Sequence, residues 1–483
     1  MVRALAIDVG TSSVRTGVVE PSGALTHTHQ RRLTIHTPNP GEVELDASEI
    51  ARLTLECARQ TLSDAGPCDV VGITNQRATT VVFDPLSGQP VGPALGWQDL
   101  RTVIDCLVLQ SEGLRLAPNQ SATKARWLVA QSGRRARDLR FATIETWIAW
   151  HLSEGALHVS DRSNAGVNGL VNVGVDGWDE HVLSVLELDR AMFPDLVDTM
   201  GSYGRATALS GAPLITALVG DQPASLFGQS CVRRGTKITF GTGAMLESVR
   251  GPEGPTSMTR FESGCFPVVV RSRDGDATWG VEGIVLSAGA CVDWLVQDLR
   301  LIGSASESSD LASGVPTSDG VSFVPALSGI GTPLWDFGAR GGFFGLTRGA
   351  TTRHLVRAVL EGVAQRGVDL IDAAQRETGQ HVDEVRVDGG MSDNEFFVQC
   401  LADFSGIRVA ISDEREATTR GCGLMALVSA EALSLDDVED LWSPVRRYEP
   451  TLSADHRLDL RAEWSRTLNR AARTIPELSD VTF

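Results

Sequence analysis

The first pattern along the chain is a pair of hydrophobic runs separated by a short polar turn. Residues 4–19, "ALAIDVGTSSVRTGVV", hold two apolar, β-branched runs, 4–9 and 14–19, on either side of a turn made of glycine, threonine and serine. Runs of this kind joined by a short polar turn predict a β-hairpin. The same pattern returns in residues 236–249, "TKITFGTGAMLESV". Its appearance in each half predicts two related α/β domains that face a cleft.

Further elements follow from the hydrophobic period. Helical patterns cover three segments of the N-terminal half: 99–116, 122–133 and 143–154. An apolar run at 213–220 predicts a buried strand that gives way to a helix at Asp221. Residues 382–406 predict a strand, a Gly-Gly turn and a helix.

One long amphipathic helix is expected in residues 350–379. Five apolar residues share one face of it: Leu355, Val356, Val359, Leu360 and Val363. Gly379 lies just past the end of the pattern, where a helix commonly terminates. A Gly- and Pro-rich piece, "RGPEGPTS" at 250–257, suggests a crossing between domains. The chain has 483 residues, which exceeds the size that a single hydrophobic core usually reaches. We therefore expect two domains, 1–247 and 248–483.

Composition and charge narrow the class of protein. The net charge of −18 disfavours a nucleic-acid partner, because phosphate backbones require basic patches. No apolar run is long enough to span a bilayer, and the N-terminus lacks the features of a secretory signal. The eight cysteines form no Cys-x-x-Cys pair, which favours free buried thiols in a reducing compartment. We therefore expect a cytoplasmic protein with a small diffusible substrate and no membrane partner.

Lysine is rare in this chain. The chain has two lysines, Lys124 and Lys237, and all the other residues in its Lys and Arg total are arginines. Lysine and arginine differ in geometry and hydration, so a lysine in a chain that otherwise uses arginine is a candidate for a specific role.

The first turn has the chemistry of a phosphate site. Glycine lets the backbone approach an anion closely, and three hydroxyls can donate to phosphate oxygens: Thr11, Ser12 and Ser13. Arg15 can pair with phosphate charge, and Asp8, at a strand end, suits a hydrated magnesium ion. An ordinary hairpin with a polar tip is equally consistent with this turn alone. The turns at 241–243 and 389–390 add two further points of close backbone approach and favour the phosphate interpretation.

Asp221 is the leading catalytic candidate. It ends the apolar run "ITALVG", where burial discourages a charge that nothing uses, and it could accept the proton of a substrate hydroxyl. The alternative is a helix N-cap, a frequent role of Asp after a strand. Arg77 and Trp97 offer the donors and the indole face that a polyol or sugar binder uses, or else serve packing and ion pairing.

Six blocks in this order resemble the FGGY carbohydrate kinases, and among them the glycerol kinases most of all. They are "AIDVGTSSVR", "NPGEVELDASEI" with "GITNQRATTVVFD", "GWQDLRT", "GDQPASLFGQ" with "TFGTGAML", "GIGTPLWDFGARGGFFGLTRGATTRHLVRAVLEG" and "VDGGMSDNEFFVQ". The resemblance runs nearly end to end. It implies two actin-like (ribonuclease H-like) ATPase domains of α/β class that close on ATP, and a kinase that phosphorylates a hydroxyl of a small polyol or sugar.

The resemblance also implies roles for individual residues. Asp221 would deprotonate the accepting hydroxyl, and Asp8 would position Mg²⁺ through water. The ATP phosphates would contact residues of both hairpins: Thr11, Ser12, Ser13, Arg15, Gly241 and Thr242. The nucleoside would lie among residues of the C-terminal half: Gly289, Asp293, Gly389, Gly390 and Asn394. The acceptor would meet a third group: Arg77, Ala78, Trp97, Asn119, Gln222 and Met245.

Several positions depart from the glycerol kinases. Where they read "NQRET" this chain reads "NQRAT", so that Ala78 replaces a hydroxyl-binding Glu; Asn119 replaces a Tyr, and Met245 an aromatic wall. Other positions are kept: Arg77, Trp97, Lys124, Asp221 and Gln222. Losing a buried carboxylate partner costs about 1–3 kcal/mol. We therefore expect a different or larger polyol, or a ketose, as substrate. Asp293 stands where the family often has Gln, which bears on nucleotide preference.

Two alternatives stay open from the sequence. One is a true glycerol kinase with a rebuilt pocket; the other is a nucleotide-switched binding or regulatory module, because one fold can serve several functions. The joint presence of Asp221, Arg77 and Trp97 argues against a pure switch. A homodimer and a homotetramer are both compatible with the resemblance.

Overall fold

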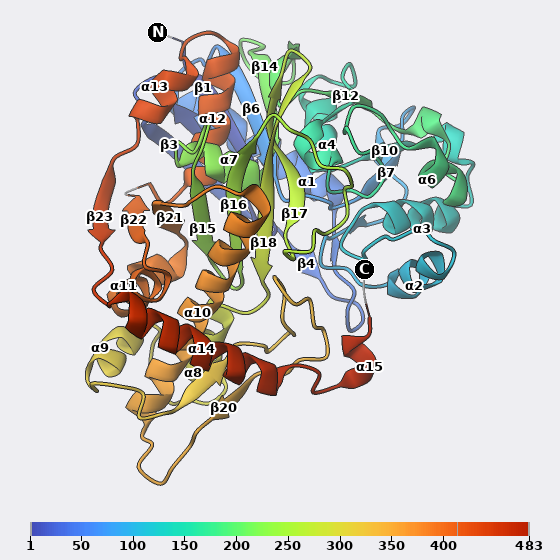
Figure 1. The fold of residues 1–483 in the computed structure, drawn as a ribbon. Coiled ribbons are helices and arrows are strands. Elements are labelled where there is room, and N and C mark those ends of the chain that lie inside the picture. The colour runs from blue at the N-terminus through green and yellow to red at the C-terminus, as the bar shows by residue number, and fades with distance from the viewer. Residues whose placement is uncertain (1, 413, 482–483) are drawn as a thin grey trace.

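The computed structural model describes residues 2–412 and 414–481, and its N-terminal half is built on a six-stranded sheet (Figure 1). The strands lie in this order across the sheet: β13 (Met200–Arg205), β14 (Leu214–Gly220), β6 (Val70–Asn75), β1 (Ala4–Val9), β2 (Ser13–Val19) and β3 (Leu25–Arg32). β1 and β2 pair antiparallel with Val9 opposite Val14, which confirms the first predicted hairpin. β6 and β14 are parallel to β1, so the carboxyl ends of these three strands meet at one edge.

The C-terminal half holds a seven-stranded sheet. Its order is β17 (Phe266–Arg273), β18 (Asp276–Val285), β16 (Ala244–Gly251), β15 (Thr236–Phe240), β21 (Glu384–Asp388), β22 (Arg408–Ser412) and β23 (Pro444–Tyr448). β15 and β16 form the second predicted hairpin, with Phe240 opposite Ala244. β21 and β22 run parallel to β15, as β6 and β14 run parallel to β1. The shared topology confirms two related α/β halves.

The second sheet begins before the expected domain boundary. The division at residues 247 and 248 falls inside β16, whereas the sheet to which β16 belongs starts with β15 at Thr236. The Gly- and Pro-rich piece at 250–257 connects β16 to β17 within the same sheet. Glycine and proline interrupt strands whether the chain changes domain or turns back within one sheet, so composition alone cannot distinguish the two.

Two layers of helices cover the faces of the N-terminal sheet. Side chains of Leu5, Ile7 and Val9 pack with α1 (Ala47–Ala65) and α4 (Ile144–Leu152). The alternate residues Ala4 and Ala6 pack on the other face, against α7 (Asp221–Gly228) and α12 (Ala417–Ser429). In Figure 1 the orange-red α12 reaches back from the C-terminal part of the chain to lie beside β1.

Helix α10 (Thr352–Thr378) runs through the core of the C-terminal half. Val356, Val359, Leu360 and Val363 are buried and Gly379 ends the helix with a left-handed conformation, as the sequence predicts. Other helices surround it: α8 (Gly289–Gln297), α9 (Glu307–Ser313), α11 (Glu395–Ser405) and α14 (Ala454–Ala471).

Short elements complete the molecule. The shorter helices are α2 (Val103–Ser111), α3 (Ala122–Ser132), α5 (Arg162–Ala165), α6 (Glu180–Val185), α13 (Leu435–Asp440) and α15 (Pro476–Ser479). Small sheets are formed by β4 (Ile35–His36), β5 (Glu44–Leu45) and β9 (Ala94–Leu95); β7 (Val81–Asp84), β8 (Gln89–Pro90) and β10 (Arg140–Ala142); β11 (Val159–Asp161) and β12 (Asp195–Val197); β19 (Ser322–Val324) and β20 (Gly342–Phe344).

The first predicted helix, 99–116, is longer than the observed one. α2 covers Val103–Ser111, because Asp99 accepts hydrogen bonds from the backbone N–H groups of Val43 and Arg101 and so holds residues before the helix in a turn. The two other predicted helices in this half correspond to α3 and α4.

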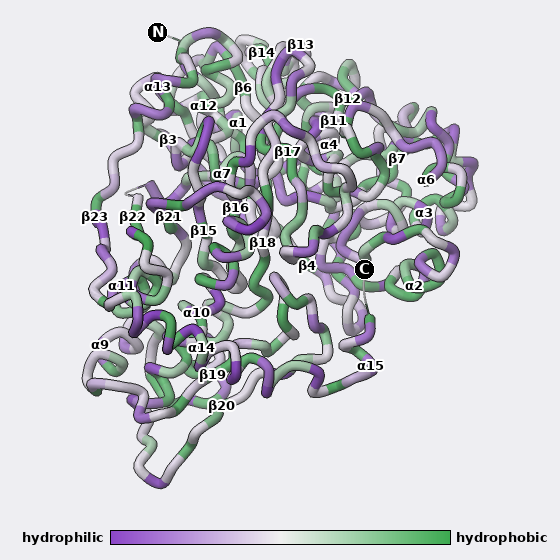
Figure 2. Tube along the Cα trace, in the orientation of Figure 1, coloured by the Kyte–Doolittle hydropathy of each residue, from purple (hydrophilic) through white to green (hydrophobic). Residues whose placement is uncertain are grey.

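The interior is apolar and contains the cysteines. Hydrophobic residues are concentrated in the strands of both large sheets and in the helix faces that pack on them, whereas outer loops are more hydrophilic (Figure 2). All eight cysteines are buried and free, as their spacing predicts. Among the described residues, no helix is both long and apolar enough to cross a membrane.

Candidate active site

The carboxyl end of β1 carries a buried carboxylate. Asp8 is 7% exposed and accepts a hydrogen bond of 2.9 Å at Oδ2 from the hydroxyl of Thr419, which comes from α12. Burial raises the pKa of Asp8 to about 6, while Thr419 and the charge of Arg15 oppose that rise. The carboxylate therefore lies at the sheet edge with few partners of its own, where a cation would stabilise its ionised form.

The turn after β1 contains a backbone hydrogen bond and lies next to an ion pair. Gly10 donates its N–H to the carbonyl of Ser13 at 2.9 Å, and the Ser12 side chain is exposed. Arg15 forms an ion pair with Glu416, four residues after β22 and just before α12. Trp97 donates from Nε1 to the Thr11 hydroxyl at 3.1 Å, so a predicted acceptor residue and a predicted phosphate residue are in contact.

Asp221 is the first residue of α7 and lies directly after β14. Gly220, not Asp221, is the N-cap, and the Asp221 carboxylate accepts instead from the N–H of Gln222 at 2.9 Å. The N-cap alternative is therefore not what the structure has. Burial raises the pKa of Asp221 above its ordinary value, while Arg77, whose Nε lies 3.3 Å from Oδ1, acts in the opposite direction.

Arg77 and Asp221 belong to a chain of charges that joins the two halves. Arg77 is 10% exposed and also contacts Glu282 of β18 at 2.5 Å. The ammonium of Lys237 lies 2.6 Å from Glu247 on the neighbouring strand and donates to the side-chain oxygen of Gln222 at 2.8 Å. Lys237 and Glu247 are both fully buried. One of the two lysines is thus an internal partner of the predicted acceptor residue Gln222.

Three of the predicted acceptor residues, Ala78, Trp97 and Asn119, lie on three separate loops. The Ala78 carbonyl accepts from the Ser121 hydroxyl at 3.1 Å, which ties the "NQRAT" loop to the start of α3. Buried Lys124 donates to the carbonyls of Gly96 at 2.7 Å and Asn119 at 3.4 Å, which ties the Trp97 loop to the exposed Asn119.

Met245 lies on β16 opposite Thr239, half-buried. No described contact joins the Met245 side chain to Ala78 or Asn119, so their common role stays a prediction.

A cavity of about 410 Å³ opens beside the second hairpin. Six of the residues predicted for ATP line it: Gly241, Thr242, Gly289, Asp293, Gly390 and Asn394. Its volume falls in the range of small-molecule sites. Asn394 is the N-cap of α11 and donates to Ser308 at 2.9 Å, which fixes one wall.

Gly389 lies behind this cavity, and not among its lining residues. Its φ is 87°, and a Cβ there would stand 2.4 Å from the carbonyl oxygen of Phe240. Glycine is therefore required for β21 to turn into the cavity wall alongside the second hairpin.

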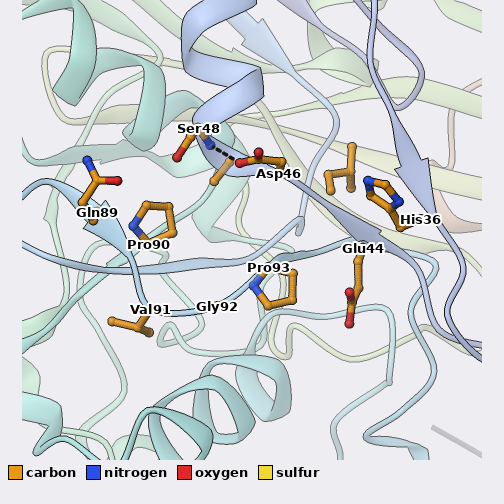
Figure 3. A pocket seen from close by; sticks show the side chains of 11 residues that line it. His36, Glu44, Asp46, Ser48, Gln89, Pro90, Val91, Gly92 and Pro93 are labelled. Carbon is orange, nitrogen blue, oxygen red and sulfur yellow. Dashed lines mark hydrogen bonds between the residues drawn. The ribbon is translucent and has the colours of Figure 1, made fainter.

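A second cavity, of about 440 Å³, lies between β5, the start of α1 and residues 89–93 (Figure 3). No residue predicted from the sequence lines it. Asp46, which points into this region, already accepts the N–H of Ser48 as the N-cap of α1. The cavity therefore offers no free anchoring carboxylate at that position.

Sequence reasoning missed the residues that hold the predicted ones in place. In the C-terminal cavity these are mainly on and near α9: Ala305, Ser306, Ser308 and Ser309. In the charged chain they are Glu247 and Glu282, whose strands carry no signal beyond hydrophobic alternation. The scarcity of lysine was the one signal that pointed to Lys237.

These features define the class of protein. Two sheets of one topology, a Gly/Thr turn after the first strand of each and a small-molecule cavity beside the second are the architecture of the actin-like ATPase fold. Among the described residues, His, Cys, Asp and Glu side chains form no cluster of three that could bind a metal by themselves.

Comparison with known proteins gives the family. The N-terminal domain model of the FGGY family of carbohydrate kinases matches residues 3–228, and its C-terminal domain model matches 236–430. A glycerol kinase of Aromatoleum aromaticum is 38% identical over 97% of this chain and 98% of its own, and one of Deinococcus radiodurans is 37% identical over 97% of both. The chain belongs to the FGGY family of carbohydrate kinases.

Solved structures agree on the fold. The glycerol kinase of Plasmodium falciparum, determined with ADP, has a TM-score of 0.91 at 25% identity and covers 98% of both chains. A gluconate kinase of Lactobacillus acidophilus has a TM-score of 0.88 at 18% identity, covering 99% of both. One fold therefore accommodates kinases named for acceptors of different size.

Proposed function

We propose that this kinase transfers the terminal phosphoryl group of ATP to a hydroxyl of a polyol larger than glycerol, or of a ketose, with Asp221 as the base. The observation that carries the proposal is the pair of Asp221 and Arg77. A half-buried carboxylate with a raised pKa lies 3.3 Å from a guanidinium at the edge where β1, β6 and β14 end. A carboxylate so placed can take a proton from an alcohol.

The reaction follows from these positions. The acceptor oxygen forms a bond to the phosphorus, the bond to the bridging oxygen of ADP breaks, and the hydroxyl proton goes to Asp221. The turns at 10–13 and 241–243 supply N–H groups and hydroxyls for the phosphates, and the 410 Å³ cavity takes the nucleoside. Mg²⁺, held by Asp8 through water, would supply charge neutralisation of the phosphates.

The departure from glycerol rests on three positions. Ala78 offers no carboxylate to a hydroxyl, Asn119 is exposed, and Met245 is a flexible side chain that lies half-buried on β16. The competing candidate is a true glycerol kinase, which the names of the relatives at 37–38% identity favour. We further propose a cytoplasmic location, since free thiols persist in reducing compartments, and a homodimer or homotetramer as the assembly.

The test is an ADP-release assay over a panel of glycerol, tetritols, pentitols, ketoses and gluconate, with Asp221→Asn as the matched variant. We expect the parent to turn over a larger acceptor with a higher kcat/KM than glycerol, and the isosteric variant to lose turnover while it still binds ADP. A kcat/KM for glycerol at the level of glycerol kinases would instead identify that activity. Nucleotide binding without turnover of any acceptor would favour the switch.

A further inference from the structure

Gln76 is a buried side chain whose polar atoms have no partner. It is 1% exposed, and neither its amide nitrogen nor its oxygen forms a hydrogen bond with any residue that the structure describes. Its backbone, by contrast, is fixed: the N–H donates to Val9 at 2.8 Å and the carbonyl accepts from the side chain of Asn75 at 2.9 Å. Leaving a buried donor or acceptor unpaired costs about 1–3 kcal/mol, so this arrangement calls for an occupant that satisfies it.

The register of the sheet places Gln76 between the two carboxylates of the site. Asn75 of β6 lies opposite Val9 of β1 on one side and opposite Gly220 of β14 on the other. The next residue on the central strand, Gln76, is therefore flanked by the turn that follows Asp8 and by Asp221.

Side-chain alternation places Gln76 on the face of Asp8. Asn75 points to the opposite face, where its side chain donates to Asn164 and Glu145. Ala4 and Ala6 of β1 and Val219 of β14 pack on the α7 and α12 face. Asp8, Gln76 and Asp221 continue that side of the three strands. The charge of Asp221 contributes to the raised pKa of Asp8, so the two carboxylates are close enough to interact electrostatically.

We propose that Gln76 donates a hydrogen bond from Nε2 to the phosphoryl group as it passes from ATP to the acceptor oxygen beside Asp221, which makes it a catalytic residue. The proposal rests on the function proposed above. An uncharged carboxamide can donate to phosphoryl oxygens without the repulsion that a third carboxylate would add. No bond to Gln76 forms or breaks: the proton of the acceptor goes to Asp221, and ADP carries away the bridging oxygen.

The test compares Gln76→Leu with the parent, using the acceptor that the panel identifies. Because the hydrogen bond is formed to the group in transfer, we expect kcat to fall about 100-fold. The KM for ATP and the rise in melting temperature on adding ADP should stay within about twofold of the parent, because ground-state binding does not depend on this contact. Gln76→Met, also apolar and of similar length, repeats the measurement should the leucine variant fail to fold.

Thr74→Val is the matched control. Thr74 lies two residues earlier on the same strand and face, is fully buried, and its hydroxyl also has no partner among the described residues. We expect this variant to keep kcat within about twofold. An equal loss in Thr74→Val, or a Gln76→Leu or Gln76→Met variant that works as fast as the parent, overturns the proposal. Turnover by the parent that Asp221→Asn abolishes shows that the proposed function stands independently, whereas a parent inactive with every acceptor removes both.

Discussion

At the scale of single residues, Ala78 combines burial with a left-handed backbone. Its φ is 61° and its side chain is 5% exposed, while its carbonyl is held by the hydroxyls of Thr80 and Ser121. Such a conformation in a residue with a Cβ persists where the surroundings impose it, and it is found disproportionately at ligand sites. The fixed carbonyl thus holds Ala78 in this conformation, and its side chain offers no polar group.

Restoring a carboxylate at this position tests what the acceptor is. We expect Ala78→Glu to raise kcat/KM for glycerol about tenfold relative to the larger acceptor, because a hydrogen bond to a charged group contributes about 1.5–3 kcal/mol. Competition between the two acceptors in the ADP-release assay measures the ratio. Ala78→Met, which adds bulk without charge, should not raise it. An unchanged ratio in Ala78→Glu would mean that this position does not meet the acceptor.

His158 gives a residue-scale prediction on pH. Its Nε2 lies 2.9 Å from the Phe141 carbonyl, its ring packs against Phe83 and Trp150, and burial lowers its pKa to about 4. The unfolded chain binds a proton at this residue below pH 6.5, while the folded chain does not until about pH 4. Stability therefore falls as pH drops from 6.5 to 4, by at most about 3 kcal/mol from this group.

The variant His158→Gln should show a shallower fall. Urea unfolding at steps between pH 7 and pH 4 gives the slope for each protein. The matched change at exposed His456, His456→Gln, should keep the slope of the parent. Equal slopes in His158→Gln and the parent would count against a neutral, half-buried His158.

At the scale of elements, α7 and α12 pack backbone against backbone. A Cβ on Gly228 would stand 1.9 Å from the carbonyl oxygen of Ala417, and one on Gly421 would stand 1.9 Å from that of Ala224. The two helices approach this closely only because glycine stands at both crossings. Since α7 begins at Asp221 and α12 carries Thr419, their spacing also sets the distance between the two carboxylates of the site.

Forcing these helices apart should disturb catalysis. We expect Gly421→Ala to reduce the free energy of unfolding by about 1–3 kcal/mol, as overpacking does, and to lower kcat at least about tenfold, since a displacement of 1 Å in a catalytic group can cost more than that. Gly349→Ala is the control, because its Cβ would meet nothing nearer than 3.5 Å. A Gly421→Ala variant with parental stability and kcat would contradict this account of the crossing.

The elements that the sequence predicts well are those whose pattern is local. Both hairpins, the strand before Asp221 and the helix that Gly379 ends are fixed by residues within a few positions of one another. The contacts that sequence reasoning missed join distant segments, such as Thr419 to Asp8 and Glu282 to Arg77. Hydrophobic period reports which face is buried, and it carries no information on which distant side chain lies opposite.

At the scale of the whole molecule, one helix connects Asp221 to the glycines beside the 410 Å³ cavity. Helix α7 starts at Asp221, and Gln229 at its far end donates to Asp388 at 2.6 Å. Asp388 ends β21 and immediately precedes the glycines beside the cavity. If the C-terminal half moves relative to the N-terminal half, the contact of Gln229 with Asp388 therefore transmits the movement through α7 to Asp221.

A substitution at Gly390 should block ADP binding in the 410 Å³ cavity without altering the contact between Gln229 and Asp388. Gly390 lines the cavity and a Cβ there meets nothing within 4 Å, so Gly390→Leu should fill the space and leave the fold intact. At one hundred times its Kd, ADP should raise the free energy of unfolding of the parent by about 2.7 kcal/mol. Thermal unfolding with and without ADP should show this rise in the parent and in Asp221→Asn, and none in Gly390→Leu. Full protection of Gly390→Leu would place the nucleotide elsewhere.

The position of α12 has a consequence for biosynthesis. The N-terminal sheet is translated first, yet the face made by Ala4, Ala6 and Val219 is covered by a helix that ends at Ser429. Large proteins expose apolar surface until their partners arrive. A nascent chain of this kinase must therefore leave the part of that face under α12 exposed until nearly nine-tenths of the chain has left the ribosome. A message truncated before α12 yields a sheet with uncovered apolar surface in place of a separately stable domain.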